Sequence, residues 1–285
     1  MALKNVLIHL DSSARSNSRL GLACSLARRW GAHLTGVFIV DLPTPEFFYA
    51  GAVPYMAVPP EELLDRIRAE AIAGSDPVQA QFRERLRTED LQGEWRLAEG
   101  NLPATLALHA RYADLTIVGQ PAPNDRREAT ASNAAIVTTV MSSGRPVLAV
   151  PYAGEFSAVG ERVLVAWNAS RESARAVNDA LPLLEQAKMV TVLAVNPRHG
   201  IGGQGDVPAA DITLHLARHG VRAEAAHTVA TDIADGETLL SYAADISADL
   251  IVAGAYGHSR ARELVFGGVT RTLLNEMTVP VFLSH

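Results

Sequence analysis

The chain repeats one series of sequence landmarks, and this internal repeat limits the folds that it can adopt. The paired landmarks, in chain order, are Val6–Asp11 (VLIHLD) with Val163–Asn168 (VLVAWN), Ala113–Gly119 (ADLTIVG) with Ala248–Gly254 (ADLIVAG), and Arg145–Val150 (RPVLAV) with Val279–Leu283 (VPVFL). Three landmarks in the same order indicate a duplicated structural unit. We therefore predict two tandem domains, residues 1–152 and 160–285, joined by the short polar segment 152–160.

Each copy alternates strand-like and helix-like segments. Strands are expected near 4–10, 33–40, 94–98, 115–119 and 146–150, and in the second copy near 162–167, 189–195, 222–228, 249–254 and 279–284. Helices are expected near 16–30, 61–88, 102–112 and 131–143, and then near 171–187, 208–219, 235–246 and 267–277. A serine-rich turn leads into the first helix of each copy, with Ser12 and Ser13 in the first and Ser170 and Ser173 in the second, and supplies good N-cap chemistry.

The expected strands are near-continuous runs of Val, Ile, Leu and Ala, which is typical of parallel strands covered by helices on both faces. The predicted fold class is therefore α/β, with two tandem open parallel five-stranded sheets flanked by helices. In such sheets a ligand is expected at the carboxyl ends of the strands, where the strand order reverses.

A glycine-rich stretch follows the fourth strand of the second copy. The apolar run that ends at Gly254 leads into Gly257, then Gly267 and Gly268, and then Thr270 on a segment with helical spacing. Glycines let backbone N–H groups approach an anion, and the N-terminus of a helix favours negative charge. This strand, loop and helix therefore predict a phosphate site. It is not a Walker A loop, because no Gly-Lys-Ser/Thr follows.

The spacing Gly254-x-x-Gly257-x9-Gly267-Gly268 resembles the ATP-binding motif of the universal stress protein family, Gly-x-x-Gly-x9-Gly-(Ser/Thr). Gly268 departs from the motif by removing a hydroxyl donor, which Thr270 partly replaces in this interpretation. The resemblance implies a Rossmann-like, adenine nucleotide alpha hydrolase-like fold. It also implies an internal pseudo-dimer in which the strands at 146–150 and 279–284 pair across a two-fold axis.

The resemblance further implies that the second copy binds ATP, with or without Mg²⁺, as a stress sensor with slow or no hydrolysis. The family's Asp at the end of the first strand is Asn168 here, an uncharged and poorer Mg²⁺ ligand. The end of the second strand, at Val195, is where the family reads adenine through main-chain groups. The residues expected to bind the nucleotide are Asn168, Val195, Gly254, Gly257, His258, Gly267, Gly268, Val269 and Thr270.

The first copy lacks an intact counterpart of this loop. Gly119 is present, but Pro121 and Pro123 stand where backbone N–H groups would have to surround a phosphate. Proline has no N–H to donate and its φ angle is restricted. We infer that the first copy has lost nucleotide binding and serves as a structural or regulatory partner.

Composition excludes several other classes of protein. The net charge is −6 and no block of Lys or Arg occurs, which argues against a nucleic-acid partner. The single cysteine, Cys24, excludes an intrachain disulfide and is expected in the core. With no secretory signal and no apolar run long enough to span a membrane, we expect a soluble, cytoplasmic protein without a membrane partner.

Residues 42–60 account for extra length in the first copy. Its prolines disfavour regular secondary structure, and its aromatic residues would form an apolar surface that favours contacts with other groups. A loop packed over its own domain, a lid and a contact in an oligomer such as a homodimer all remain open. The segment also suggests an alternative function, a nucleotide-independent scaffold for a protein partner that the sequence does not name.

Several motifs resemble binding or catalytic motifs but lack part of the pattern that those sites need. Gly200–Gly205 satisfies Gly-x-Gly-x-x-Gly but follows the wrong strand at the wrong distance for a dinucleotide turn. His215 and His219 have zinc-ligand spacing on an expected helix, but without a Glu or a third ligand a solvated helix face is favoured. His9 lies on the same side of its strand as Asp11, and a buried histidine is favoured over a catalytic dyad.

Within the glycine loop, phosphate contact and simple exposure remain open for His258, and exposed loop cations are favoured for Arg260 and Arg262. No Gly-x-Ser-x-Gly motif occurs, so a hydrolase triad lacks its nucleophile turn. We assign no catalytic residue and no metal ligand. A nucleotide-using α/β enzyme remains a further alternative.

Overall fold

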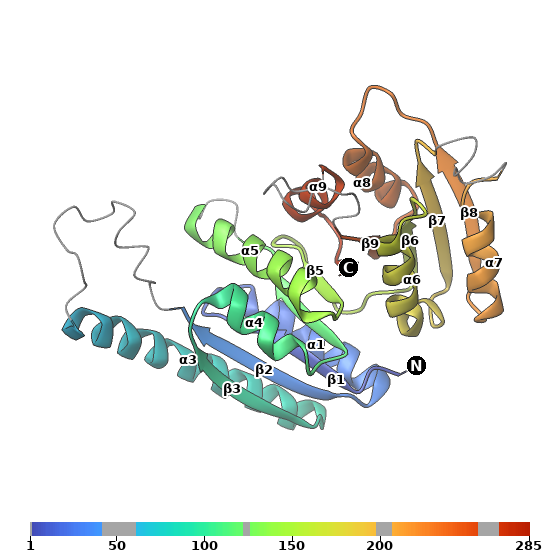
Figure 1. Cartoon of the computed structure of the whole chain (residues 1–285). Helices are drawn as coiled ribbons and strands as arrows, with labels where there is room; N and C mark the ends of the chain where they lie inside the picture. The colour runs from blue at the N-terminus through green and yellow to red at the C-terminus, as the bar shows by residue number, and fades with distance from the viewer. Residues whose placement is uncertain (1, 42–60, 122–125, 198–206, 256–267) are drawn as a thin grey trace.

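The computed structural model describes residues 2–41, 61–121, 126–197, 207–255 and 268–285, which form two α/β halves (Figure 1). The strands are β1 (Asn5–His9), β2 (His33–Val40), β3 (Gly93–Glu99), β4 (Leu115–Gly119), β5 (Val147–Val150), β6 (Arg162–Ala166), β7 (Met189–Val195), β8 (Ala223–Thr228), β9 (Leu250–Gly254) and β10 (Val281–Ser284). They lie in the order β3-β2-β1-β4-β5-β10-β9-β6-β7-β8, so the two halves share one ten-stranded sheet.

Strands are parallel within each half, and the halves meet through one antiparallel pair. Val281 of β10 lies opposite Ala149 of β5, and Leu283 lies opposite Val147. This pairing confirms the predicted joint between the segments 146–150 and 279–284. Because the joint is antiparallel, the carboxyl ends of the strands in the two halves lie at opposite edges of the shared sheet.

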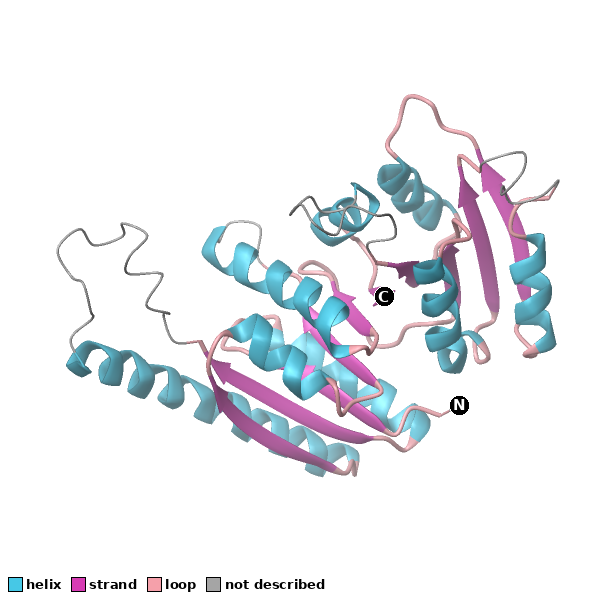
Figure 2. Ribbon diagram, in the orientation of Figure 1, coloured by secondary structure: helices cyan, strands magenta, loops and turns pink. Residues whose placement is uncertain are grey.

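Helices cover both faces of the sheet (Figure 2). They are α1 (Ser16–Trp30), α3 (Glu61–Glu89), α4 (Leu102–Ala110), α5 (Arg126–Ser143), α6 (Arg171–Leu184), α7 (Ala210–Arg218), α8 (Asp235–Asp245) and α9 (Gly268–Glu276). One core cluster contains residues of α1, α3, α6 and α7, and the other contains residues of α4, α5, α8 and α9. The apolar strands are therefore buried on both faces, as their sequence predicts.

Three further expectations are tested by the described residues. Cys24 is buried in α1, and burial raises the pKa of its thiol to about 12, as expected for a core residue. Helix α5 begins at Arg126, earlier than predicted, because the polar start of this helix has no apolar periodicity to reveal it. Among the described helices, none combines the length and the apolar character needed to cross a membrane.

The repeated Ala-Asp pair before β4 and β9 anchors the first strand of each half. Asp114 accepts hydrogen bonds from the backbone N–H groups of Lys4 and Asn5 at 2.8 and 2.9 Å. Asp249 accepts three such bonds, from residues 160, 161 and 162, at 2.9–3.1 Å. A carboxylate that accepts several backbone N–H groups holds the start of one strand against its neighbour.

Replacing Asp249 with alanine should lower the free energy of unfolding by about 2 kcal/mol, because three backbone N–H groups lose a charged acceptor. Urea denaturation followed by circular dichroism measures the loss. Asp232→Ala, at an exposed position, is the matched control. Equal stability of the two variants would show that the Asp249 contacts do not contribute.

The first helices of the two halves begin differently. In α6 the Oγ atom of Ser170 accepts the backbone N–H of Ser173 at 3.1 Å, which confirms the predicted cap at Ser170, whereas Ser173 lies inside the helix. Helix α1 begins at Ser16, as predicted, but within the described residues its N-cap position, Arg15, has no side-chain capping bond. The prediction that Ser12 and Ser13 cap α1 is therefore wrong. Asp11 accepts the backbone N–H and the hydroxyl of Ser13 instead and holds that segment in a turn.

Candidate functional site

The strand order of the second half places a crevice between β6 and β9. The chain proceeds from β6 outward to β7 and β8, and then crosses to β9 on the other side of β6. Ligands in open α/β sheets bind at the carboxyl ends of the strands at such a reversal. Asn168 follows β6, Gly254 ends β9 and Val195 ends β7. The fold therefore brings these three predicted residues to neighbouring strand ends.

Gly254 permits a close approach between β9 and the start of α6. A Cβ atom at Gly254 would lie 2.5 Å from both the carbonyl carbon of Glu172 and the backbone nitrogen of Ser173. Real Cβ atoms do not approach backbone this closely, so only glycine fits without a shift of α6. The first turn of α6, with its backbone N–H groups, is thereby held beside the end of β9.

Asn168 shapes the turn that leads into α6. Its Oδ1 atom accepts the backbone N–H of Ser170 at 3.1 Å, and Ala169 between them has a φ of 60°. Asp11 makes the equivalent bond to the N–H of Ser13 in the first half. An amide oxygen can therefore take over the turn-forming role of the carboxylate, although Asn168 brings no charge.

Helix α9 supplies the remaining described residues of the predicted set. Gly268 at its start is exposed, Val269 is half-buried, and Thr270 is only 4% exposed. A ligand contact of the buried Thr270 hydroxyl stays a prediction. Because β9, α9 and β10 form a parallel strand–helix–strand unit, α9 begins at the carboxyl edge of the sheet. Gly257, His258 and Gly267 lie outside the described residues.

The corresponding place in the first half is filled by an arginine. Alignment of the two copies pairs Arg19 with Ala176. The Arg19 side chain is 4% exposed, and its Nη1 atom lies 2.0 Å from the position of a Cβ atom on Gly119. Its Nε atom donates to the carbonyl oxygen of His9 at 2.9 Å, and Nη2 pairs with Asp11 at 2.7 Å. Beside the glycine at this strand end, the first half therefore has a guanidinium group where the second half has helix backbone.

This cluster changes the protonation of its neighbours. Burial and the charge of Arg19 lower the pKa of His9 to about 4, against the opposing effect of Asp11. Burial disfavours the charge on Asp11, but Arg19, His9 and the hydrogen bonds from Ser13 outweigh it and lower the pKa to about 2. His9 is therefore neutral and buried, which confirms the structural interpretation of this histidine.

The free energy of unfolding should fall as the pH is lowered from 7. The pKa of His9 drops from 6.5 to about 4 on folding, so unfolded chains bind more protons in that window and become favoured. The expected loss from His9 is about 2 kcal/mol by pH ~5. His9→Gln should flatten the pH dependence of the urea midpoint, whereas His227→Gln, at an exposed site, should not. An unchanged slope in His9→Gln would contradict this prediction.

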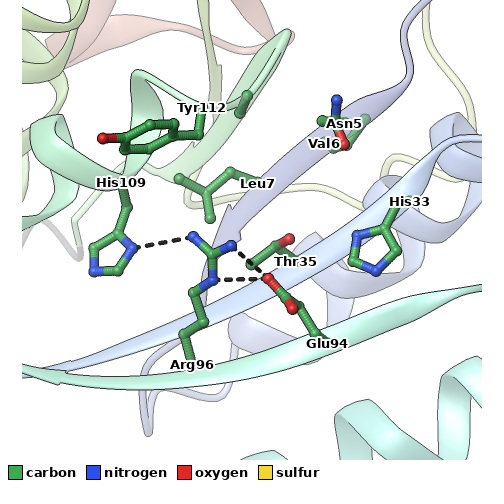
Figure 3. A pocket seen from close by; sticks show the side chains of 10 residues that line it. Asn5, Val6, Leu7, His33, Thr35, Glu94, Arg96, His109 and Tyr112 are labelled. Carbon is green, nitrogen blue, oxygen red and sulfur yellow. Dashed lines mark hydrogen bonds and ion pairs between the residues drawn. The ribbon is translucent and has the colours of Figure 1, made fainter.

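A cavity of about 400 Å³ lies at the opposite, amino edge of the first half (Figure 3). There the Nη2 atom of Arg96 pairs with Glu94 at 2.5 Å, and Nη1 lies 3.4 Å from Nδ1 of His109. Burial and the charge of Arg96 lower the pKa of His109. A hollow of about 300 Å³ lined by Thr191 and Glu224 occupies the equivalent edge of the second half. The two hollows therefore come with the duplicated fold, and neither lies at the carboxyl edge.

The other sequence motifs yield no site in the described part of the chain. The rings of His215 and His219 lie 4.7 Å apart between centroids, but Nε2 of His215 is buried and has no partner among the described residues. The favoured solvated face therefore applies to the exposed His219 only. No group of three potential metal ligands occurs within the described ranges. Residues 200–205, Arg260 and Arg262 lie outside them.

The sequence interpretation missed Arg19 and Gln120. Gln120 follows β4, and its side chain contacts the second half at Leu274. The alignment of the two copies pairs the charged Arg19 with the small apolar Ala176, and this difference could have marked Arg19 as an unusual residue at a helix position. Nothing in the sequence pairs Gln120 with a residue so far along the chain.

Two doubly wound α/β units in one continuous sheet define a duplicated Rossmann-like protein, and comparisons with known proteins agree. The model of the Universal stress protein family matches residues 160–285. Residues 160–285 are therefore similar to the universal stress protein family, and the whole chain has the fold of two such domains in tandem. Comparison with curated proteins gives no match.

Solved structures extend the likeness to the whole chain. A universal stress protein from Archaeoglobus fulgidus DSM 4304 matches with a TM-score of 0.74 and 14% identity, over 98% of this chain and 95% of its own. A putative universal stress protein from Pseudomonas aeruginosa UCBPP-PA14 matches with a TM-score of 0.59 and 12% identity, over 99% and 93% of the two chains. At these identities the likeness establishes the fold.

Proposed function

We propose that the protein is a stress-response module whose C-terminal domain, residues 160–285, binds ATP at the crevice between β6 and β9. The observation that carries the proposal is the close packing of α6 on Gly254, which holds the first turn of a capped helix at the strand-order reversal. The N-termini of α6 and α9 both start at this edge, and helix N-termini favour phosphate groups.

The predicted motif supports the same site. Gly257, His258 and Gly267 lie in the sequence between β9 and α9, outside the described residues, and exposed Gly268 begins α9. In this proposal the loop contacts the phosphates, Val195 contacts adenine through its backbone, and Asn168 binds the ribose or the base. Because Asn168 has no charge, Mg²⁺ would be held chiefly by the phosphates.

We propose that residues 1–152 form a domain that does not bind nucleotide. Two features support this assignment. Arg19 lies against Gly119 where a ligand would approach the strand ends, and its charge is already paired with Asp11. Pro121, in the following segment, has no N–H to offer a phosphate. The first domain would then act on the second as a structural or regulatory partner.

Calorimetric titration of the full chain with ATP and Mg²⁺ tests the proposal. We expect about one site per chain, in keeping with a single intact glycine loop. The Gly257→Asp, Gly267→Asp double variant should lose binding because its carboxylates repel phosphate. Ser12→Asp, which adds a carboxylate at the equivalent edge of the first half, should bind as the wild type does.

Absence of binding by nucleotide-free wild-type protein would overturn the ATP assignment and favour the scaffold alternative. About two sites per chain would overturn the assignment of a vacant first domain. Rapid turnover of ATP would instead favour the enzyme alternative.

A further inference from the structure

Gln120 joins the two halves at a position that the proposed function leaves unexplained. It follows β4 directly, where the chain of the first half departs from the carboxyl edge of the sheet. Its Nε2 atom donates to the carbonyl oxygens of Leu274 and Asn275 at 3.0 and 2.9 Å. Its Oε1 atom accepts the backbone N–H of Tyr152 at 2.9 Å. One side chain therefore ties β4, the interdomain segment and the second half together.

The two carbonyl groups that Gln120 binds belong to the last turn of α9. The final carbonyls of a helix have no partner within the helix, so a side-chain donor there stabilises its end. Asn133 of α5 adds a weaker contact, with its Nδ2 atom 3.4 Å from Oδ1 of Asn275. The C-terminus of α9 is thus held by residues of the first half.

The opposite end of α9 is the start of the proposed phosphate site. The helix has nine residues, from Gly268 to Glu276, which corresponds to a length of about 13 Å. Its inner face is anchored by buried Leu273 and Leu274. A short helix is stiff along its axis, so fixing the last turn also restricts where Gly268 lies.

The two copies differ at this contact. The counterpart of Gln120 is Ala255, whose methyl side chain cannot donate a hydrogen bond. In the reverse direction, Arg175 of α6 donates to the carbonyl oxygen of Gly144 at 3.2 Å. The first half therefore holds α9 through the side-chain amide of Gln120, and the second half has no amide at the equivalent position, Ala255.

We propose that Gln120 is a positioning residue that sets the place of α9 and thereby the affinity of the C-terminal domain for ATP. This inference rests on the proposed function. The first domain would then have a defined role. Gln120, which follows Gly119 where the nucleotide loop of the first domain would begin, supports the nucleotide site of the second domain instead. Because coupling between two sites is reciprocal, ATP should also strengthen the contact between Gln120 and Tyr152.

The test compares Gln120→Leu, which keeps the volume and removes the amide, with Gln186→Leu at an exposed position in the turn after α6. Without nucleotide, amide hydrogens of α9 should exchange about tenfold faster in Gln120→Leu, as expected for the loss of a hydrogen-bonded cap. Calorimetry should show an affinity for ATP weaker by about three- to tenfold. Gln186→Leu should match the wild type in both measurements.

A third readout separates coupling from a merely structural role. ATP should slow exchange of the Tyr152 amide in the wild type, and this effect should disappear in Gln120→Leu. Unchanged α9 exchange in Gln120→Leu would overturn the positioning role whether or not ATP binds. Faster α9 exchange with unchanged ATP affinity would overturn the coupling. If the wild type binds no ATP, the proposed function and the coupling both fail, and α9 exchange alone decides whether Gln120 holds the helix.

Discussion

Replacing Gly254 with alanine is expected to lower the free energy of unfolding by about 3 kcal/mol. The added Cβ atom would lie 2.5 Å from the backbone of Glu172 and Ser173. Because the clash is with backbone atoms, a change of side-chain rotamer cannot relieve it. Helix α6 would have to shift away from β9, and the crevice between β6 and β9 would change shape. Urea denaturation measures the loss, and calorimetry with ATP should show weakened binding in the same variant.

Gly268→Ala is the matched control for this substitution. A Cβ atom at Gly268 meets nothing within 4 Å, and the residue begins α9, where alanine is well tolerated. Its stability should therefore stay within about 0.5 kcal/mol of the wild type. Equal losses in Gly254→Ala and Gly268→Ala would show that the packing of α6 on β9 is not the reason for glycine at 254.

Arg19→Met is expected to lower the free energy of unfolding by about 3 kcal/mol, because breaking a buried ion pair leaves its partner uncompensated. Methionine keeps the apolar stem, but Asp11 loses its charge partner and the His9 carbonyl loses its donor. The partial exposure of Asp11, 39% of its side chain, places this value at the low end for buried pairs.

Arg66→Met provides the contrast. Arg66 pairs with Glu70 at 3.2 Å on the surface of α3, with 78% and 70% of the two side chains exposed. Exposed pairs of this kind contribute about 0–1 kcal/mol, so its loss should be barely measurable. A similar effect of the two substitutions would contradict the view that burial gives the Arg19 cluster its importance.

Most of the fold could be predicted from local patterns. The runs at 33–40, 115–119 and 189–195 became β2, β4 and β7 with the predicted boundaries. The antiparallel joint between β5 and β10 was also predicted, through resemblance to a family. Apolar periodicity and repeated landmarks are local signals, and a fold made of repeated strand–helix units depends mainly on them.

The candidate site was predicted only in part. Asn168, Val195 and Gly254 lie at or just after the carboxyl ends of three adjacent strands, β6, β7 and β9, as their places in the sequence implied. The buried state of Thr270 was not foreseen, because burial depends on how α9 packs. The boundaries of α1 were predicted correctly, but its uncapped start was not, because Asp11 accepts the backbone N–H of Ser13 and holds that segment in a turn.

The sequence by itself determined the duplication, the two parallel units and the glycine motif that only the second copy retains. The tertiary structure decided what fills the corresponding place in each half, a buried guanidinium beside Gly119 and helix backbone beside Gly254. It also decided that Gln120 holds a helix 154 residues further along the chain. Hydrogen bonds between residues so distant in sequence leave no periodic trace, because they exist only once the whole sheet has brought its two halves together.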